Sequence, residues 1–318
     1  MRVAVIGSGG IGGLYGGLLA RAGHAVAFLA RGKHLEAIRQ RGLEIRSADF
    51  GTFTIQAPAS DDASQLGQAD LVLFAVKTYD LQAAAQQAKV ALASDASLLT
   101  FQNGLDAPDE LAKIVGPQHV LIGTTRLETT IVEPGVIGHL TPGHVVTVSA
   151  FEGPATPRAE LIAQTFRDAG ITTTVEPDGH RALWEKASQL IPLATITAVC
   201  RAPIGPIRDL AETRALAETL LDEFSQVARA YGYDLADSQS GKGLNLRSAP
   251  SSMKASMARD FERGNRTELE ALSGAVVRLG EARGVDVPAS RTAYSILKLR
   301  ERLEAGAETP LGITASGR

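Results

Sequence analysis

A glycine-rich motif beside the N-terminus constrains the fold of this chain more than any other feature. The short apolar run Val3-Ala4-Val5-Ile6 is followed directly by Gly7-Ser8-Gly9-Gly10-Ile11-Gly12, after which Leu14, Leu18 and Leu19 recur at helical spacing. Strand, glycine turn and helix follow one another in this order in domains that bind a dinucleotide. We therefore predict that the chain opens with a Rossmann-type βαβ unit.

Three glycines of this motif have separate tasks in such a turn. Gly7 permits the tight turn, Gly9 lets the backbone approach a pyrophosphate, and Gly12 lets the helix lie close to the strand. The phosphates then lie at the helix N-terminus, where free N–H groups and the positive end of the helix dipole point at them. Glycine-rich turns also occur for purely structural reasons, so the flanking strand and helix carry this prediction.

The end of the second predicted strand, residues 24–29, indicates which dinucleotide binds. An NAD-binding protein usually offers Asp or Glu to the ribose hydroxyls about twenty residues after the glycines. This chain has Arg31 there, followed by Lys33 and His34. Because a guanidinium pairs well with a 2′-phosphate, we predict NADP(H) rather than NAD or FAD. The alternative interpretation is a solvated basic loop.

Strand-like and helix-like segments then alternate to about residue 177. The strand candidates cover residues 70–76, 97–101, 120–123 and 145–151, and the helix candidates cover residues 79–92 and 161–169. This alternation predicts an α/β domain with a doubly wound, mostly parallel sheet. Ligands lie beyond the carboxyl ends of such strands. Lys77 and the run Gln102-Asn103-Gly104, which follow two of the strands, are therefore candidate residues at the rim of a site.

The second half of the chain is helical in pattern. Amphipathic spacing extends over residues 211–231 and 268–283, and Pro288 begins another helix. A length of 318 residues suits two domains. We expect an N-terminal Rossmann-type dinucleotide-binding domain over residues 1–177 and a C-terminal all-α domain over residues 178–318.

Composition narrows the range of partners. Thirty-two Lys and Arg against 35 Asp and Glu give a net charge of −3, so no basic field is available for nucleic acid. The longest apolar runs are far shorter than the roughly 18 residues of a membrane span. The single cysteine, Cys200, fits a reducing compartment, and the six histidines show no metal-binding spacing. We expect a cytoplasmic protein without a metal, nucleic-acid or membrane partner.

The segment Trp184-Glu185-Lys186 opens an otherwise apolar, threonine-rich stretch. Lys186 therefore brings a charge into a segment that we expect to be buried. Burial disfavours the charged form of an amine, which suits a lysine to donate a proton. Taken alone, however, Lys186 is better interpreted as a surface lysine whose stem covers apolar neighbours.

Together these motifs resemble the ketopantoate reductase family, 2-dehydropantoate 2-reductases that reduce a 2-keto acid with NADPH. The resemblance covers nearly the whole chain. It rests on the glycine motif and on the spaced elements Arg31, Val76-Lys77, Asn103-Gly104, Gly123-Thr124-Thr125, Trp184-Glu185-Lys186, Ser256-Met257, Arg263-Gly264 and Thr267-Glu268. The family fold implies that residues 1–177 bind NADP(H) and that residues 178–318 supply substrate-binding and catalytic groups for a small 2-keto acid.

The resemblance implies a role for each matching residue. Lys186 looks like the general acid that protonates the forming alkoxide, and Glu268 like the carboxylate that contacts substrate and orders the lysine. Asn103 resembles the catalytic asparagine that positions the keto acid and the nicotinamide. Ser256 resembles the hydroxyl that meets the substrate carboxylate, and Lys77 the rim lysine near the cofactor. As alternatives, Glu268 is an exposed charge at a helix N-terminus, Ser256 a surface residue and Asn103 a turn former.

The chain departs from the family pattern on one helix face. Family members commonly carry substrate-binding asparagines four and eight residues after the catalytic lysine, where this chain has Leu190 and Ala194. Thr197 is nearly in line with them at 3.6 residues per turn and is our substitute substrate-binding candidate. Reaction type is therefore better defined than substrate.

Three functions are compatible with these residues. The chain reduces ketopantoate, or as a paralogue reduces a more apolar 2-keto acid, or senses NADP(H) without turnover. The joint presence of Lys186, Asn103 and Glu268 argues against the sensor, because a sensor needs no proton donor. A homodimer is compatible with all three.

Overall fold

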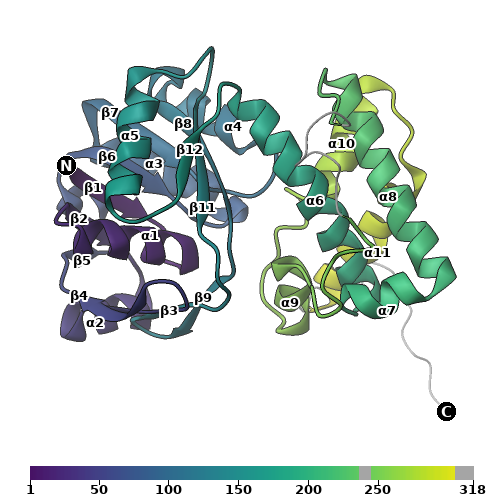
Figure 1. Ribbon diagram of the computed structural model, residues 1–318, viewed down its shortest axis with the longest axis horizontal. Helices are drawn as coiled ribbons and strands as arrows, with labels where there is room; N and C mark the ends of the chain where they lie inside the picture. The colour runs from purple at the N-terminus through teal and green to yellow at the C-terminus, as the bar shows by residue number, and fades with distance from the viewer. Residues whose placement is uncertain (236–244, 305–318) are drawn as a thin grey trace, which may run out of the picture. The chain divides into compact units, whose positions relative to one another are not determined.

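The computed structural model describes residues 1–235 and 245–304 (Figure 1). The chain divides into two compact units, Met1–Leu183 and Trp184–Arg318. The division falls inside helix α6 (Gly179–Cys200), slightly after the expected boundary between residues 177 and 178.

The larger sheet of the first unit contains eight strands. They are β1 (Arg2–Ile6), β2 (Ala25–Leu29), β5 (Ala59–Ser60), β6 (Ala69–Phe74), β7 (Leu92–Thr100), β8 (Val120–Arg126), β11 (Val145–Ala150) and β12 (Thr173–Val175). Their order across the sheet is β12-β11-β8-β7-β6-β1-β2-β5. Every neighbouring pair is parallel except β8 with β11, which is antiparallel. The predicted doubly wound, mostly parallel sheet is confirmed.

Helices cover both faces of this sheet, which explains why its central strands are apolar throughout. The helices are α1 (Gly10–Arg21), α2 (Gly32–Arg41), α3 (Leu81–Ala91), α4 (Ala107–Val115) and α5 (Pro157–Asp168). In β1, Val3 and Val5 join the core that includes residues of α1 and α5. Ala4 and Ile6 point the other way, into the core that includes residues of α3 and α4. The period of two along a strand thus feeds two separate hydrophobic cores.

A second, smaller sheet was not predicted from the sequence. It comprises β3 (Leu43–Ser47), β4 (Gly51–Ile55), β9 (Thr129–Glu133) and β10 (Val136–His139), in the order β4-β3-β10-β9. It packs on α1, where a Cβ at Gly13 would lie 2.7 Å from Ile137 Cγ1 and one at Gly17 3.0 Å from Ile45 Cγ1. Helix α1 therefore needs glycine on a second face, because a sheet lies on each side of it.

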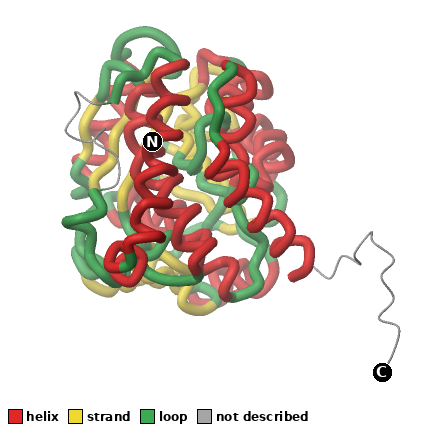
Figure 2. The backbone as a smooth tube through the Cα atoms, turned by 90° about the vertical axis from the view of Figure 1, so that its right-hand side faces the viewer, coloured by secondary structure: helices red, strands yellow, loops and turns green. Residues whose placement is uncertain are grey.

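The described part of the second unit forms helices and no strands (red in Figure 2). After α6 come α7 (Ile204–Asp209), α8 (Ala211–Ala230), α9 (Ser256–Glu262), α10 (Ser273–Arg283) and α11 (Pro288–Glu304). Helix α8 packs against α7, α10 and α11. The expected helices over 211–231 and from Pro288 are confirmed. None of the described helices is both long and apolar enough to cross a membrane.

The helix expected over residues 268–283 begins later, at Ser273. The backbone N–H groups of Ala271 and Leu272 both donate to the carbonyl of Glu268, which closes a separate turn. Leu272 then has a non-helical φ of −105° with ψ of −91°. The apolar spacing continues through this turn, so the pattern alone could not locate the start of the helix.

A buried carboxylate joins two helices of the second unit. Glu223 on α8 is only 4% exposed and accepts hydrogen bonds from Ala289 N at 2.8 Å and Ser290 N at 2.7 Å. These N–H groups belong to the first turn of α11, which has no intrahelical partners for them. The negative charge also suits the positive end of the helix dipole. Glu223 therefore caps α11 from a neighbouring helix.

Candidate active site

The glycine turn after β1 is shaped by tight contacts at two of its three predicted glycines. Gly7 has a φ of +99°, and a Cβ there would lie 2.7 Å from Val76 N. A Cβ at Gly12 would overlap the carbonyl oxygen of Gly7 and lie 2.9 Å from Val5 Cγ1. Both positions require glycine for the protein's own packing, the first also because of its backbone conformation.

Gly9 differs, because no neighbour within residues 1–235 and 245–304 explains its missing side chain. A Cβ there would have no heavy atom within 4 Å. Its φ of −74° and ψ of −160° are open to other residues, and no side chain caps the N-terminus of α1 that follows. An open space above uncapped helix N–H groups is the cradle that a phosphate fills and that a Cβ would narrow. The turn therefore fits the pyrophosphate of a dinucleotide.

Two side chains hold this turn from outside. Ser8 Oγ donates to the carbonyl of Leu29 at the end of β2, at 3.0 Å. Gly135 N donates to His34 Nδ1 at 3.0 Å, so His34 Nε2 carries the proton and donates to the Ser8 carbonyl at 2.9 Å. Burial lowers the pKa of His34, against a smaller opposing effect of its bond to Ser8. The sequence grouped His34 with the phosphate-binding residues, whereas both its ring nitrogens bind backbone groups.

The other predicted cofactor residues lie at the same edge of the sheet. Arg31 is exposed and stands at the N-cap of α2, just beyond β2. Lys77 follows β6 and Asn103 follows β7, and both are half-buried. Because β2, β1, β6 and β7 are adjacent and parallel, their carboxyl ends place all of these residues with the glycine turn.

Gln102, next to Asn103, is the buried member of this rim. Its side chain is 5% exposed, and Nε2 donates to the carbonyl of Val76 at 3.3 Å. The sequence placed Gln102 at the rim but assigned no role to it. The turn at Gly104, with a φ of +98°, then leads the chain away toward α4.

The second unit buries two opposite charges. Lys186 on α6 is 8% exposed, and Glu268, between α9 and α10, is 4% exposed. Lysine and glutamate are almost never this buried unless they are paired. The interpretations of Lys186 as a surface lysine and of Glu268 as an exposed helix charge are therefore wrong. Ser256, by contrast, is exposed as the first residue of α9.

The altered face of α6 contains no polar side chain at the two asparagine positions. Leu190 is half-buried and Ala194 is completely buried. Thr197 is also completely buried, and its hydroxyl donates to the carbonyl of Leu193 at 2.7 Å. A substrate contact through Thr197 would require this hydroxyl to turn from its helical partner.

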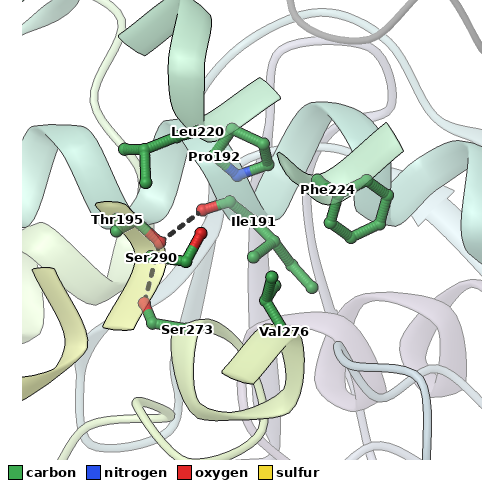
Figure 3. Close-up of a pocket in the computed structure, with 8 residues that line it drawn as sticks. All are labelled: Ile191, Pro192, Thr195, Leu220, Phe224, Ser273, Val276 and Ser290. Atoms are coloured by element: carbon green, nitrogen blue, oxygen red, sulfur yellow. Dashed lines mark hydrogen bonds between the residues drawn. The ribbon is translucent and has the colours of Figure 1, made fainter. Parts of the chain in front are cut away.

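A small cavity lies elsewhere in the second unit (Figure 3). It is lined by Ile191, Pro192, Thr195, Leu220, Phe224, Ser273, Val276 and Ser290. Thr195 Oγ1 donates to the carbonyl of Ile191 at 2.9 Å and lies 2.8 Å from Ser273 Oγ. The volume, about 10 Å³, is at the lower limit for one water molecule, so the cavity is too small for a keto acid.

No arrangement of three or more His, Cys, Asp or Glu side chains suited to a metal ion occurs within residues 1–235 and 245–304. His139 illustrates why. Its Nδ1 lies 2.8 Å from Ser47 Oγ and its Nε2 lies 3.0 Å from the carbonyl of Gly143. The ring is therefore engaged in holding the smaller sheet to the loop before β11.

Comparison with known proteins gives consistent matches over both units. The family model for ketopantoate reductase PanE/ApbA matches residues 3–153, and that for the ketopantoate reductase PanE/ApbA C terminal matches residues 178–301. The 2-dehydropantoate 2-reductase of Halobacterium salinarum is 33% identical over 303 residues, which are 95% of this chain and 99% of the relative. That of Archaeoglobus fulgidus is 30% identical over 297 residues, 93% of this chain and 97% of the relative.

Two solved structures are also similar to this chain over nearly its full length. The PanE/ApbA family ketopantoate reductase from Ralstonia eutropha JMP134 has a TM-score of 0.88 and 33% identity, covering 96% of this chain and all of the other (100%). The 2-dehydropantoate 2-reductase from Methylococcus capsulatus has a TM-score of 0.84 and 28% identity, covering 98% and 99% of the two chains.

Proposed function

The chain belongs to the ketopantoate reductase family, and on that premise we propose that it reduces 2-dehydropantoate to pantoate with NADPH. One observation carries the proposal: the helical unit buries an ammonium, Lys186, and a carboxylate, Glu268. A fold that needed only packing would place apolar residues there, because burying a charge is costly. Buried ionisable groups are instead typical of acid–base chemistry.

Lys186 is the proposed general acid. When bound, NADPH would supply a hydride to C2 of the keto acid, which would leave negative charge on the C2 oxygen. The Lys186 ammonium stabilises that charge and donates its proton to the same oxygen. Glu268 orders the ammonium and contacts the substrate. Asn103 positions the keto group, and Ser256 binds the substrate carboxylate.

The residues proposed to bind the cofactor lie at the carboxyl edge of the large sheet. Gly9, with its open space and uncapped helix, receives the pyrophosphate, while Gly7 and Gly12 shape the turn. Arg31 selects NADPH by pairing with the 2′-phosphate, for which its exposed position beyond β2 is suited. Lys77 lies near the cofactor at the rim.

A second candidate function is supported by the apolar face of α6. Leu190 and Ala194 cannot supply the hydrogen bonds of two asparagines, and Thr197 is engaged with Leu193. Each unsatisfied polar group of a desolvated substrate costs about 1–3 kcal/mol, or roughly tenfold to a hundredfold in kcat/KM. A paralogous reductase for a 2-keto acid with a bulkier hydrocarbon group and no 4-hydroxyl would avoid this cost.

The deciding experiment measures NADPH oxidation with 2-dehydropantoate and with such apolar 2-keto acids. Wild type is compared with Leu190→Asn/Ala194→Asn. A preference of wild type for 2-dehydropantoate by orders of magnitude, with no gain from the double substitution, supports ketopantoate reduction. A preference for the apolar acids, reversed by the asparagines, supports the paralogue.

NADPH binding without turnover of any keto acid would support the third hypothesis, an NADP(H) sensor. A sensor has no use for the buried charges at positions 186 and 268.

For the assembly and location of the protein we propose a homodimer in the cytoplasm. The single cysteine supports a reducing compartment, and sedimentation of the purified protein tests the dimer.

A further inference from the structure

An amide oxygen at the rim of the sheet is buried without a donor. Gln102 Oε1 is sealed from water and has no hydrogen-bond partner among the described residues. The amide cannot simply be turned around, because Nε2 already donates to the carbonyl of Val76 at 3.3 Å. Turning it would bring two oxygens together. Native structures rarely leave such a group unsatisfied, so the oxygen calls for a donor from outside the described chain.

The position of Gln102 indicates which ligand brings that donor. Gly7 of the phosphate-binding turn packs on Val76, and Val76 accepts the hydrogen bond of Gln102, so the amide is one residue removed from the turn. Val76, Lys77 and Asn103 around it are only half-buried. The rim can therefore adjust by the small amount that a donor requires.

The order of the strands indicates that Gln102 lies near the nicotinamide half of the cofactor. Arg31 follows β2 on one side of β1, whereas Gln102 follows β7 on the other side. Phosphates at the turn after β1 and a 2′-phosphate at Arg31 leave the nicotinamide half over β6 and β7. Strands lie about 4.8 Å apart, so β7 is roughly 10 Å from β1. The carboxamide is the part of the nicotinamide half farthest from the phosphates, and its N–H₂ is a hydrogen-bond donor.

We propose that Gln102 is a positioning residue whose Oε1 accepts a hydrogen bond from the nicotinamide carboxamide. The inference rests on the proposed binding of NADP(H) at this edge. The hydrogen bond fixes the rotation of the nicotinamide ring, and so the face from which hydride leaves. The donation of Nε2 to Val76 holds the amide in the orientation that presents the oxygen.

The test uses Gln102→Met, which keeps the length of the side chain and removes the oxygen. Dissociation constants are measured for three ligands: NADP⁺, its 3-acetylpyridine analogue, which lacks the N–H₂ group, and adenosine 2′,5′-bisphosphate, which lacks the nicotinamide half. The matched control is Ser149→Ala on β11, because Ser149 Oγ is the other buried side-chain atom without a partner among the described residues. Thermal unfolding is followed for each protein.

We expect Gln102→Met to weaken NADP⁺ roughly threefold to tenfold, the effect of one hydrogen bond, and to leave the analogue and the bisphosphate unchanged. Ser149→Ala should change none of the three. Equal weakening of NADP⁺ and its analogue would overturn the assignment to the carboxamide. Unchanged NADP⁺ affinity, or equal loss for all three ligands, would overturn the role of Gln102 altogether.

A measurement on wild type alone guards against a variant that does not fold. Wild type should bind the acetylpyridine analogue more weakly than NADP⁺ by the same factor, and equal affinity would contradict the proposal. If wild type binds neither NADP⁺ nor the bisphosphate, the proposed cofactor itself is wrong. That result differs from a failure confined to Gln102.

Discussion

Replacing Gly9 with alanine should separate cofactor binding from folding. The added Cβ meets no heavy atom of the described chain within 4 Å, and the backbone of Gly9 suits other residues. We therefore expect the free energy of unfolding to stay within about 0.5 kcal/mol of wild type, or to rise slightly because alanine restricts the unfolded chain. The substitution should instead weaken NADPH binding, because the methyl group keeps the pyrophosphate from the N–H groups of α1.

The magnitude follows from the hydrogen bonds that are lost. A hydrogen bond to a charged group contributes about 1.5–3 kcal/mol. Losing the equivalent of one such bond weakens NADPH roughly tenfold to a hundredfold, at 1.4 kcal/mol per factor of ten.

Gly12→Ala is the matched control, since its Cβ would overlap the Gly7 carbonyl and crowd Val5. Overpacking of this kind costs about 1–3 kcal/mol, or roughly 2–4 °C in Tm per kcal/mol for a domain of this size. Calorimetric titration with NADPH and thermal unfolding are run on both variants. If Gly9→Ala binds NADPH as tightly as wild type, the space at Gly9 is not the phosphate site. If it unfolds as early as Gly12→Ala, the turn has no room for a Cβ at position 9.

Four further predictions test the remaining assignments. Arg31→Ala should reduce the preference for NADPH over NADH roughly tenfold or more while Lys33→Ala does not, and an unchanged ratio of the two dissociation constants would contradict the role of Arg31. Lys186→Ala should lower kcat about 10²- to 10⁴-fold with NADPH binding retained, which steady-state kinetics and titration measure together; a near-normal kcat would remove Lys186 from the mechanism. In urea unfolding, Glu223→Ala should lower the free energy of unfolding by about 3 kcal/mol or more, and Glu223→Gln by roughly half as much, because the amide keeps one acceptor for the N-terminus of α11. A loss below about 1 kcal/mol would show that water replaces the cap. Burial lowers the pKa of His34 below the unfolded value of about 6.5, so its contribution to stability is complete above about pH 6.5 and is lost as pH falls toward the folded pKa. Wild type should therefore lose more stability than His34→Gln between about pH 7.5 and 5.5, and parallel losses in the two proteins would refute this.

Local patterns were sufficient for six of the eight strands of the large sheet, all but β5 and β12, and for the helices α1, α3 and α5 that cover it. The run Val3 to Ile6, the glycines after it and the leucines of α1 each act over a few residues, which is the range that a sequence pattern reports. The adjacency of parallel carboxyl ends then follows from topology. For this reason the chain alone located Arg31, Lys77 and Asn103 at one edge.

Other features depend on partners that are distant in the chain. His34 binds Gly135, 101 residues away, and only the smaller sheet that packs on α1 brings that turn to it. The same sheet explains Gly13 and Gly17, which had no visible purpose in the sequence. Short strands such as β9 and β10 form because their neighbours are there, since pairing and burial decide strand formation more than propensity does.

Burial marks the same division for the charged residues. The pattern of residues along the chain was enough to predict the order of strand, glycine turn and helix, the α/β class of the first half and the helical class of the second. It could not decide whether Lys186 and Glu268 are surface charges or buried ones, nor that Glu223 would cap another helix. A side chain's burial is set by which elements pack over it, and packing joins residues whose separation along the chain carries no periodic signal.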